Sequence, residues 1–400
     1  MIVETNIDEL KKRENSLKII KGIIHSRGRN QLHDLTGLSG GFLLKKEDLN
    51  LLETYVGPAL FEDQLQLIGK KHLGGEKILG VNRTSSGILA TIMALVRPDS
   101  YVIHYLPQLP SHPSIPRSTK LIGANYLEFD NLKDFYIPDN TSLIVITGST
   151  MDHQVITIEE FKEIIKITKS RKNHDPIDKY SQTYDEIPVM VDDASGARLR
   201  TIIFNQPSAI ELGADLVVTS TDKLMDGPRG GLMAGKKYLI NKIKSKAHQF
   251  GLEAQPPMVA GMVRGLENFN PENLLKSLEK KQKLLECLNK NFNGFELTPT
   301  GIMITPEALN SEIENRGIKI LLSDNDISFT WAMILLREYG LVTIPSVGMP
   351  GASATLRFDL AASDAKNLKL SNLVEIINSS FESLLNVVDN PEKCQDIIFN

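Results

Sequence analysis

One lysine stands between a strand-like run and a glycine-rich turn. Residues 214–218 lead into Ser220-Thr221-Asp222-Lys223, and Gly227-Pro228-Arg229-Gly230-Gly231 follows. At a strand end, beside backbone that a ligand can approach closely, a lysine amine can form a Schiff base with an aldehyde cofactor. The alternative is an exposed loop lysine, because most lysines lie on protein surfaces.

A pair of carboxylates ends a second strand-like run upstream. Residues 187–191 are followed by Asp192-Asp193-Ala194-Ser195-Gly196. Pyridoxal phosphate is an electron sink when its pyridine nitrogen stays protonated, and that requires a nearby anion. We expect Asp192 to reach this nitrogen and Ala194 to lie under the ring. Asp193 should point to the other side, because side chains alternate along a strand. The alternative for Asp192 is a cap on the following turn.

A third segment could hold a phosphate. Val81-Asn82-Arg83-Thr84-Ser85-Ser86-Gly87 precedes an apolar helical run at 88–95. Free backbone N–H groups and the positive end of the helix dipole make such a first turn an anion site. We therefore expect Ser85, Ser86 and Gly87 to bind the cofactor phosphate, with a plain N-cap as the alternative.

The order of phosphate turn, aspartate and lysine resembles the aspartate-aminotransferase superfamily of pyridoxal-phosphate enzymes, also called fold type I. Within it, residues 192–196 and 221–231 look most like bacterial selenocysteine synthase and its archaeal relatives. The resemblance runs from about residue 35 to residue 360. It implies an α/β fold, in which a large domain has a mostly parallel, seven-stranded sheet covered by helices and a small α+β domain follows. It also implies pyridoxal phosphate as cofactor, with Lys223 and Asp192 as catalytic residues.

The spacing of apolar residues agrees with a parallel sheet, because strands and helices alternate along the chain. Strand-like runs occur at 101–105, 125–129, 142–147, 187–191 and 216–219. Residues 158–167 have helical periodicity, and Thr157 with Glu160 forms a capping-box pattern. The polar stretch 170–186 is expected to be a surface loop.

Three parts are expected: an N-terminal segment at 1–50, a cofactor-binding large domain at 51–270 and a small C-terminal domain at 271–400. A helix is predicted at 271–292, since it begins with proline and glutamate and carries leucines at helical spacing. In the family a long helix at this point leads to the small domain. The runs 301–304 and 341–344 would then form the short sheet of that domain.

The resemblance gives roles to two further residues of the large domain. His112 follows the strand 101–105, where relatives place a ring on the pyridine face; the alternative is a loop histidine held by backbone hydrogen bonds. Ser220 lies three residues before Lys223, where relatives often place a hydroxyl on the phosphate. Arg83, Arg229 and Arg264 are weaker candidates for the same anion.

Arg357 matches an arginine of the small domain that often holds the α-carboxylate of an amino acid. Its planar fork can make two parallel hydrogen bonds to a carboxylate, which a lysine cannot do. The alternative is a pair between Arg357 and Asp359 on one strand face.

The composition favours a cytoplasmic enzyme without a metal. The chain of 400 residues has a formal charge of −4, so it should not be drawn strongly to DNA or to a membrane. Its two cysteines, Cys287 and Cys394, argue against a disulfide framework or a cysteine-based metal site. No apolar run approaches the roughly 18 residues of a membrane span, and no signal peptide is recognisable.

The same charge balance bears on the substrate. A charged tRNA demands an extended basic surface, but Lys and Arg (45) are fewer than Asp and Glu (49). We therefore expect a small amino acid, although the resemblance keeps a tRNA substrate open. The expected reaction is β-elimination or β-replacement through Lys223. An aminotransferase, or a tRNA-associated or regulatory protein with little turnover, is the alternative.

Because relatives complete each site at a two-fold interface, a homodimer or higher even oligomer is expected, with residues 255–257 contributing to the site of the neighbouring subunit.

Overall fold

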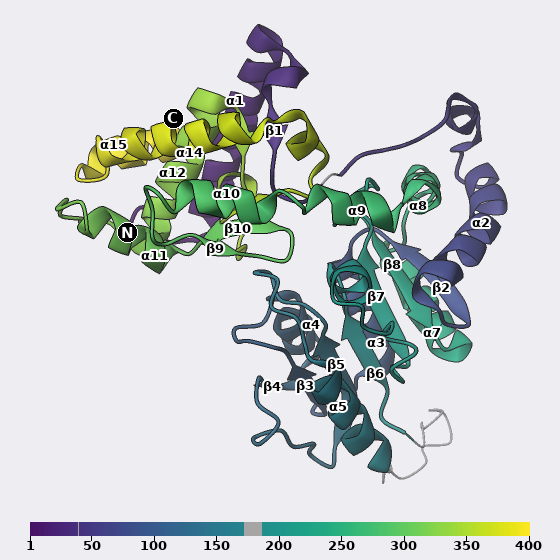
Figure 1. Cartoon of the computed structure of the whole chain (residues 1–400). Coiled ribbons are helices and arrows are strands. Elements are labelled where there is room, and N and C mark those ends of the chain that lie inside the picture. Colours follow the sequence, from purple (N-terminus) through teal and green to yellow (C-terminus); the bar gives the residue numbers. More distant parts are fainter. Residues whose placement is uncertain (39, 172–185) are drawn as a thin grey trace. The chain divides into compact units, whose positions relative to one another are not determined.

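The computed structural model describes residues 1–38, 40–171 and 186–400. The chain forms two compact units (Figure 1). Unit 1 consists of residues 1–38 and 272–400, and unit 2 consists of residues 39–271. The expected segment 1–50 is therefore not a unit of its own, because its first 38 residues pack with the C-terminal part of the chain. Residues 172–185 of the predicted surface loop lie outside the described residues.

Unit 2 is built around a seven-stranded sheet with the order β2-β8-β7-β6-β5-β3-β4. The strands are β2 (Lys77–Val81), β3 (Tyr101–Tyr105), β4 (Asn125–Phe129), β5 (Thr141–Thr147), β6 (Val189–Asp192), β7 (Leu216–Ser220) and β8 (Gly231–Gly235). β8 runs antiparallel to both of its neighbours, β2 and β7, and the other pairs are parallel. The sheet is thus the mostly parallel one that the resemblance implies.

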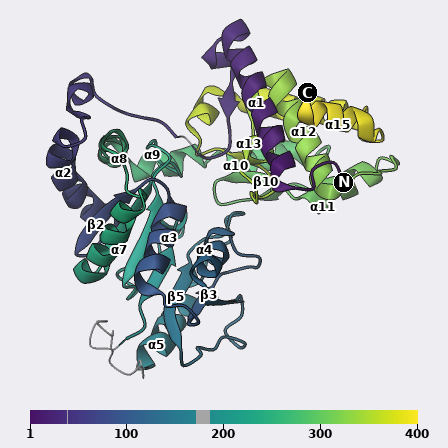
Figure 2. The same cartoon turned by 180° about the vertical axis from the view of Figure 1, so that it is seen from behind.

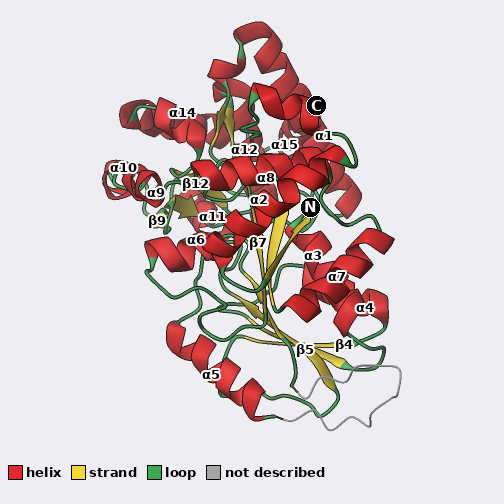
Figure 3. Ribbon diagram, turned by 90° about the vertical axis from the view of Figure 1, so that its right-hand side faces the viewer, coloured by secondary structure: helices red, strands yellow, loops and turns green. Residues whose placement is uncertain are grey.

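Helices cover both faces of this sheet (Figure 3). One face carries α3 (Thr84–Leu95), α4 (Ser114–Ile122) and α7 (Lys237–Gln249), and the other carries α2 (Val56–Leu73), α5 (Ile158–Ser170) and α8 (Pro256–Asn268). Successive strand residues alternate between the two cores: Met190 packs with α3, and Val191 packs with α5. Strands covered on both faces are apolar throughout, which explains the long Val and Ile runs.

The start of α5 shows how the local sequence sets an element. The hydroxyl of Thr157 accepts the Glu160 N–H at 3.1 Å, and the Glu160 carboxylate accepts the Thr157 N–H at 3.1 Å. The predicted capping box is therefore confirmed. Phe161 and Ile164 then enter the core of unit 2.

Unit 1 is an α+β unit with two small sheets. β9 (Glu296–Leu297), β10 (Gly301–Ile304) and β12 (Leu356–Asp359) form an antiparallel sheet in the order β12-β10-β9. β1 (His33–Asp34) pairs in parallel with β11 (Leu341–Val342), so residues near the N-terminus belong to this unit. Its helices include α1 (Asn6–Arg27), α11 (Pro306–Glu314), α12 (Asp324–Tyr339), α13 (Ile344–Val347), α14 (Leu370–Leu385) and α15 (Pro391–Phe399). Figure 2 shows α1 beside α12 and α13.

The single helix predicted at 271–292 is wrong. The structure has α9 (Pro271–Ser277) and α10 (Lys281–Leu288), separated by a turn. In that turn the Leu278 N–H donates to Leu275 O and the Lys281 N–H to Leu278 O, so short-range bonds replace the helical i→i−4 pattern. Leu278 becomes buried at the turn. Among the described residues, no helix is long and apolar enough to cross a membrane.

Candidate active site

Three chain segments meet at one edge of the unit 2 sheet. The parallel strands β2, β6 and β7 end there, and the antiparallel β8 begins there. Gly231, the first residue of β8, pairs with Val81 on one side and with Ser220 on the other. Ligands of open α/β sheets bind at the carboxyl ends of such strands. The segments that follow β2, β6 and β7 are the three that carry the predicted motifs.

The glycine at this position allows the start of α3 to approach the sheet. A Cβ on Gly231 would lie 2.6 Å from the carbonyl carbon of Arg83 and 2.7 Å from the nitrogen of Thr84. No side chain caps the N-terminus of α3. Ser85, Ser86 and Gly87 lie in this first turn. The plain N-cap is therefore not what the structure shows, and the turn keeps the positive end of its dipole for an anion.

Asp192 ends β6 on the sheet face that carries α3, as the alternation from Met190 requires. Its carboxylate is buried. Burial raises the pKa of this carboxyl to about 6, while the charge of Lys223 and a backbone hydrogen bond from Ala194 act in the opposite direction. Within the described residues, its Oδ1 atom is buried and has no hydrogen-bond partner. A buried carboxylate oxygen without a hydrogen-bond partner needs a cation or a hydrogen-bond donor beside it.

Asp193 lies on the opposite side and has a different partner. Its carboxylate receives Nε of Arg200 at 3.0 Å and Nη2 of Arg200 at 2.5 Å, and both side chains are buried. Gly148 and Gly196 make room for this pair, because a Cβ on either would come within 1.9 Å of Asp193 Oδ1. Two neighbouring carboxylates therefore differ in role: one is held in an ion pair, and the other has an oxygen unsatisfied.

Lys223 lies in a loop that closes on itself after β7. The Thr221 N–H donates to Gly230 O at 3.0 Å, and the Thr221 hydroxyl donates to Pro228 O at 2.6 Å. Lys223 is half-buried, and its charge acts on the carboxylate of Asp192. The next residue, Leu224, has φ of 59°, in the left-handed region that costs a non-glycine residue roughly 1–2 kcal/mol. Strain held beside a reactive side chain is typical of functional sites.

Sequence reasoning missed Arg198, which ties this loop to the Asp192 segment. Its guanidinium is fully buried and donates to Lys223 O at 2.9 Å, to Ala194 O at 3.2 Å and to Ser220 O. It also donates to Nε2 of His72 at 3.3 Å. Burial and the nearby guanidinium lower the pKa of His72 to about 3, so this imidazole is a neutral acceptor. The one signal in the sequence is a pair of arginines directly after the aspartate motif.

His112 precedes α4 in the loop after β3. Desolvation, followed by the positive charges of Lys223, Arg117 and Arg83, lowers the pKa of this imidazole, so it is neutral. Its Nδ1 is hydrogen-bonded to the hydroxyl of Ser114, and part of its side chain stays exposed although surrounding protein atoms desolvate the ring. His112 therefore lies within electrostatic range of Lys223, as a ring that stacks on a cofactor would. The stacking itself stays a prediction.

Ser220 is placed differently from the expectation. Its hydroxyl donates to a carboxylate oxygen of Asp222, which is buried. A phosphate oxygen accepts hydrogen bonds, so Ser220 could bind it only by releasing Asp222. The weaker candidate Arg264 is also engaged elsewhere, because Asp48 accepts from its Nε at 2.9 Å and from its Nη2 at 2.6 Å.

Arg357 belongs to unit 1, where it lies buried in β12 opposite Met303. Its charge acts on Asp359, whose pKa is nonetheless raised because burial outweighs that effect. Asp359 accepts from the Thr300 hydroxyl at 2.8 Å and from the Ala361 N–H at 2.9 Å. The predicted contact of Arg357 with a substrate carboxylate thus still rests on the sequence.

Comparison with known proteins decides the family. A curated protein of Methanosphaera stadtmanae, named a UPF0425 pyridoxal phosphate-dependent protein, is 48% identical over 98% of this chain and 99% of its own length. The chain belongs to this family. A model described as the UPF0425 C-terminal domain matches residues 291–369, and one described as L-seryl-tRNA selenium transferase matches residues 167–292.

Solved structures support the fold. The chain is similar to a SepCysS chain crystallised with the SepCysE N-terminal domain, with a TM-score of 0.56 and 17% identity over 94% of this chain and 98% of that chain. It is also similar to N-succinyldiaminopimelate aminotransferase from Mycobacterium tuberculosis, with a TM-score of 0.52 and 15% identity over 92% and 90% of the two chains. The resemblance to fold type I, and within it to selenocysteine-synthase-like proteins, is therefore confirmed.

The described residues of unit 2 fit pyridoxal phosphate. The unsatisfied Oδ1 of Asp192 suits a protonated ring nitrogen, and the uncapped start of α3 suits a phosphate. Lys223 lies within electrostatic range of both Asp192 and His112. Lys223, Asp192 and the first turn of α3 would therefore hold the group, and Ala194, directly after the aspartates, would lie under its ring.

Proposed function

We propose that this member of a pyridoxal-phosphate-dependent family is an enzyme that acts on a small amino acid by β-elimination or β-replacement. The observation that carries the proposal is the buried, unpartnered oxygen of Asp192 on the sheet face where α3 begins. Bound there, pyridoxal phosphate would supply an electron sink for a negative charge on the substrate α-carbon. The remaining argument concerns what the chain itself contributes.

Lys223 would hold the cofactor through its amine and then move the proton of the substrate α-carbon. Its loop is fixed by two means, the hydrogen bonds of Thr221 and the guanidinium of Arg198. A fixed amine is what proton transfer at one carbon requires. Asp192 would keep the ring nitrogen protonated, because that cation satisfies its buried oxygen.

A small substrate is supported by the charge distribution. Two residues of the basic run at the N-terminus are already engaged within unit 1: Lys12 is buried and donates to Pro345 O at 2.6 Å, and Arg29 is paired with Asp364 at 2.8 Å. Because acidic residues also outnumber basic ones in the sequence, we expect tRNA to bind only in the non-specific range of about 10⁻⁴ to 10⁻⁶ M. DNA should likewise not be a partner.

The substrate class follows from the leaving group that β-chemistry needs. Free serine, phosphoserine and cysteine carry one on the β-carbon, and Arg357 is the predicted partner of their α-carboxylate. Elimination from phosphoserine would break the Cβ–O bond and release phosphate, pyruvate and ammonia, with water as the co-reactant. An aminotransferase would instead require a 2-oxo acid as acceptor and release no phosphate.

The test is a titration of the cofactor-loaded protein with these three amino acids and with aminoacylated tRNA. We expect free amino acids to change the cofactor absorbance, phosphate or sulfide to be released, and Arg357→Ala to weaken the absorbance change. Tight, saturable binding of charged tRNA with no response to any free amino acid would overturn the small-substrate proposal. Amino transfer to a 2-oxo acid without loss of the β-substituent would favour the aminotransferase, and a spectral response without product would favour a regulatory protein.

We also propose a homodimer or a higher even oligomer. The segment at 255–257, where relatives contribute to a neighbouring subunit, begins α8, with Gln255 as its N-cap. A self-complementary two-fold contact is the commonest way in which such oligomers form.

A further inference from the structure

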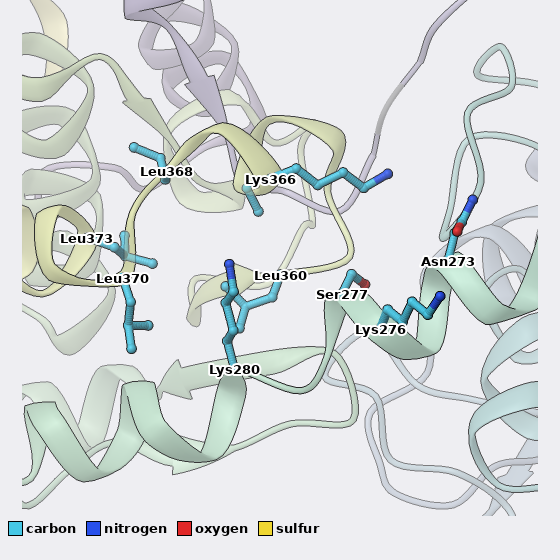
Figure 4. A pocket seen from close by; sticks show the side chains of 10 residues that line it. Asn273, Lys276, Ser277, Lys280, Leu360, Lys366, Leu368, Leu370 and Leu373 are labelled. Atoms are coloured by element: carbon cyan, nitrogen blue, oxygen red, sulfur yellow. The ribbon is translucent and has the colours of Figure 1, made fainter.

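Unit 1 contains a cavity whose lining combines cations with an apolar floor (Figure 4). Its volume is about 400 Å³, and it lies between α9, the turn before α10, the segment after β12 and the start of α14. Cavities of this size are in the range that accommodates a small organic ligand. Every residue that lines it belongs to unit 1.

Three lysines supply the charge: Lys276, Lys280 and Lys366. None of the other lining residues is acidic. In the described part of the chain, no hydrogen bond or ion pair engages any of these three ammonium groups. Figure 4 shows Lys280 extending beside Leu360, with Lys366 on the far side of the cavity. Three lysines on one cavity give it a positive potential, which attracts an anion.

The start of α14 adds to this positive potential. Leu370, the first residue of the helix, lines the cavity, and no side chain caps the helix at Lys369. The N-terminus of a 16-residue helix carries a partial positive charge and free N–H groups. With the lysines, it favours a dianion over a monoanion.

The floor is apolar. Leu360 and Leu373 belong to the core of unit 1, and Leu368 packs against it. Leu368 and Leu370 are only partly buried, and an apolar group on the ligand would cover the surface that they leave exposed, whereas an inorganic ion would not. A cluster of lysines that is merely solvated would not need an apolar surface beside it.

We propose that this cavity binds a phosphate monoester carrying an apolar group. Lys276, Lys280 and Lys366 hold the phosphate, and Leu360, Leu368 and Leu373 contact the apolar part. The proposal rests on unit 1 and is independent of the chemistry proposed for Lys223.

The test uses the full-length protein loaded with pyridoxal phosphate, reduced with borohydride and freed of unbound cofactor, so that the probes do not enter the cofactor site and no free cofactor competes for the cavity. The fluorescent sulfonate 8-anilinonaphthalene-1-sulfonate is bound first and then displaced by decyl phosphate, decanoate or inorganic phosphate. We expect saturable displacement, with decyl phosphate binding at least about tenfold more tightly than either of the others, because it alone has both a dianion and an apolar chain.

Variants locate the site. Lys280→Gln combined with Lys366→Gln should weaken decyl phosphate at least about tenfold, since each lost charge-assisted contact removes of order one factor of ten. The matched control is Lys290→Gln, an exposed lysine outside the lining, which should leave the affinity unchanged. All three lysines are exposed, so the variants should fold.

The proposal is overturned if the probe does not bind saturably, or if the double variant and the Lys290 control bind decyl phosphate equally well. Equal competition by inorganic phosphate would show that the apolar floor takes no part. Equal competition by decanoate would show that the site does not select a phosphate.

Discussion

The neighbouring residues Asp192 and Asp193 should respond in opposite directions to the same substitution by asparagine. In cofactor-free protein at pH 7, Asp192 is a buried carboxylate whose pKa is raised from 3.8 to about 6. A raised folded-state pKa means that the unfolded state releases this proton first, so the stability that Asp192 contributes falls as pH rises from about 4 to 6. The shift of about 2 units corresponds to about 3 kcal/mol lost at neutral pH.

Asp192→Asn removes that penalty. We expect the free energy of unfolding of the cofactor-free protein to rise by up to about 3 kcal/mol at pH 7, and the decline between pH 4 and 6 to become smaller than in the wild type. The value is an upper one, because the amide still buries polar atoms. Pyridoxal phosphate should stabilise this variant less than the wild type.

Asp193→Asn should do the reverse. It removes the carboxylate that pairs with Arg200 and leaves a fully buried guanidinium without its counter-ion. Breaking a buried pair on one side costs about 3–5 kcal/mol. The two variants are thus expected to differ by up to about 6–8 kcal/mol, a large part of the roughly 5–15 kcal/mol that stabilises a typical domain.

The assay is urea unfolding of cofactor-free protein. Hydrogen exchange of peptides from β5, β6 and β7 monitors the unfolding of unit 2. Trp331, the single tryptophan of the chain, lies in unit 1, so its fluorescence reports the other unit as an internal reference. If Asp192→Asn destabilised unit 2 and Asp193→Asn did not, the assignment of the two side chains would be reversed. Equal effects would refute the electrostatic reasoning.

Three further predictions concern the site and its assembly. Arg198→Lys should lower the affinity for pyridoxal phosphate by roughly tenfold, because one ammonium group cannot replace a guanidinium that donates to three carbonyl groups. A fluorescence titration of cofactor-free protein measures this affinity. An unchanged affinity would refute the positioning role of Arg198. Gly231→Ala should displace Arg83 and Thr84 and weaken cofactor binding by the same assay, whereas Gly22→Ala, with open space around its Cβ, should not. Sedimentation velocity should show a dimer or a multiple of it, and a cofactor-loaded, fully active monomer would contradict this.

The strands of unit 2 could be predicted from the sequence because their signal is local. The runs at 101–105 and 125–129 coincide with β3 and β4, and the end of β6 at Asp192 lies one residue beyond the predicted run. Buried parallel strands are apolar on both faces, and this makes them recognisable without any knowledge of their neighbours. The same alternation predicted that Asp193 points away from Asp192, and the structure agrees.

Interactions between distant residues could not be predicted in this way. Arg264 looked available for a phosphate, yet its partner Asp48 is 216 residues away in the chain. Arg198 lies next to a recognised motif, but its role depends on carbonyl groups at Ala194, Ser220 and Lys223, which have no sequence signature. A backbone acceptor is the same chemical group in every residue, so only the fold identifies it.

The prediction of a single helix at 271–292 was wrong for a related reason. Its leucines have helical spacing on both sides of Leu278, so periodicity alone does not show the turn. The N-terminal segment was likewise divided by tertiary contacts, since β1 pairs with β11 more than 300 positions later.

Identifying the lysine that carries the cofactor tests the central claim most directly. Borohydride reduction of the pyridoxal-phosphate-loaded protein fixes the cofactor to the amine that holds it, and a modified lysine resists trypsin. The account predicts a labelled peptide covering residues 201–229, in which cleavage after Lys223 is missed, and no label in Lys223→Ala. Label on another lysine, or an unlabelled Lys223 in fully loaded protein, would contradict it.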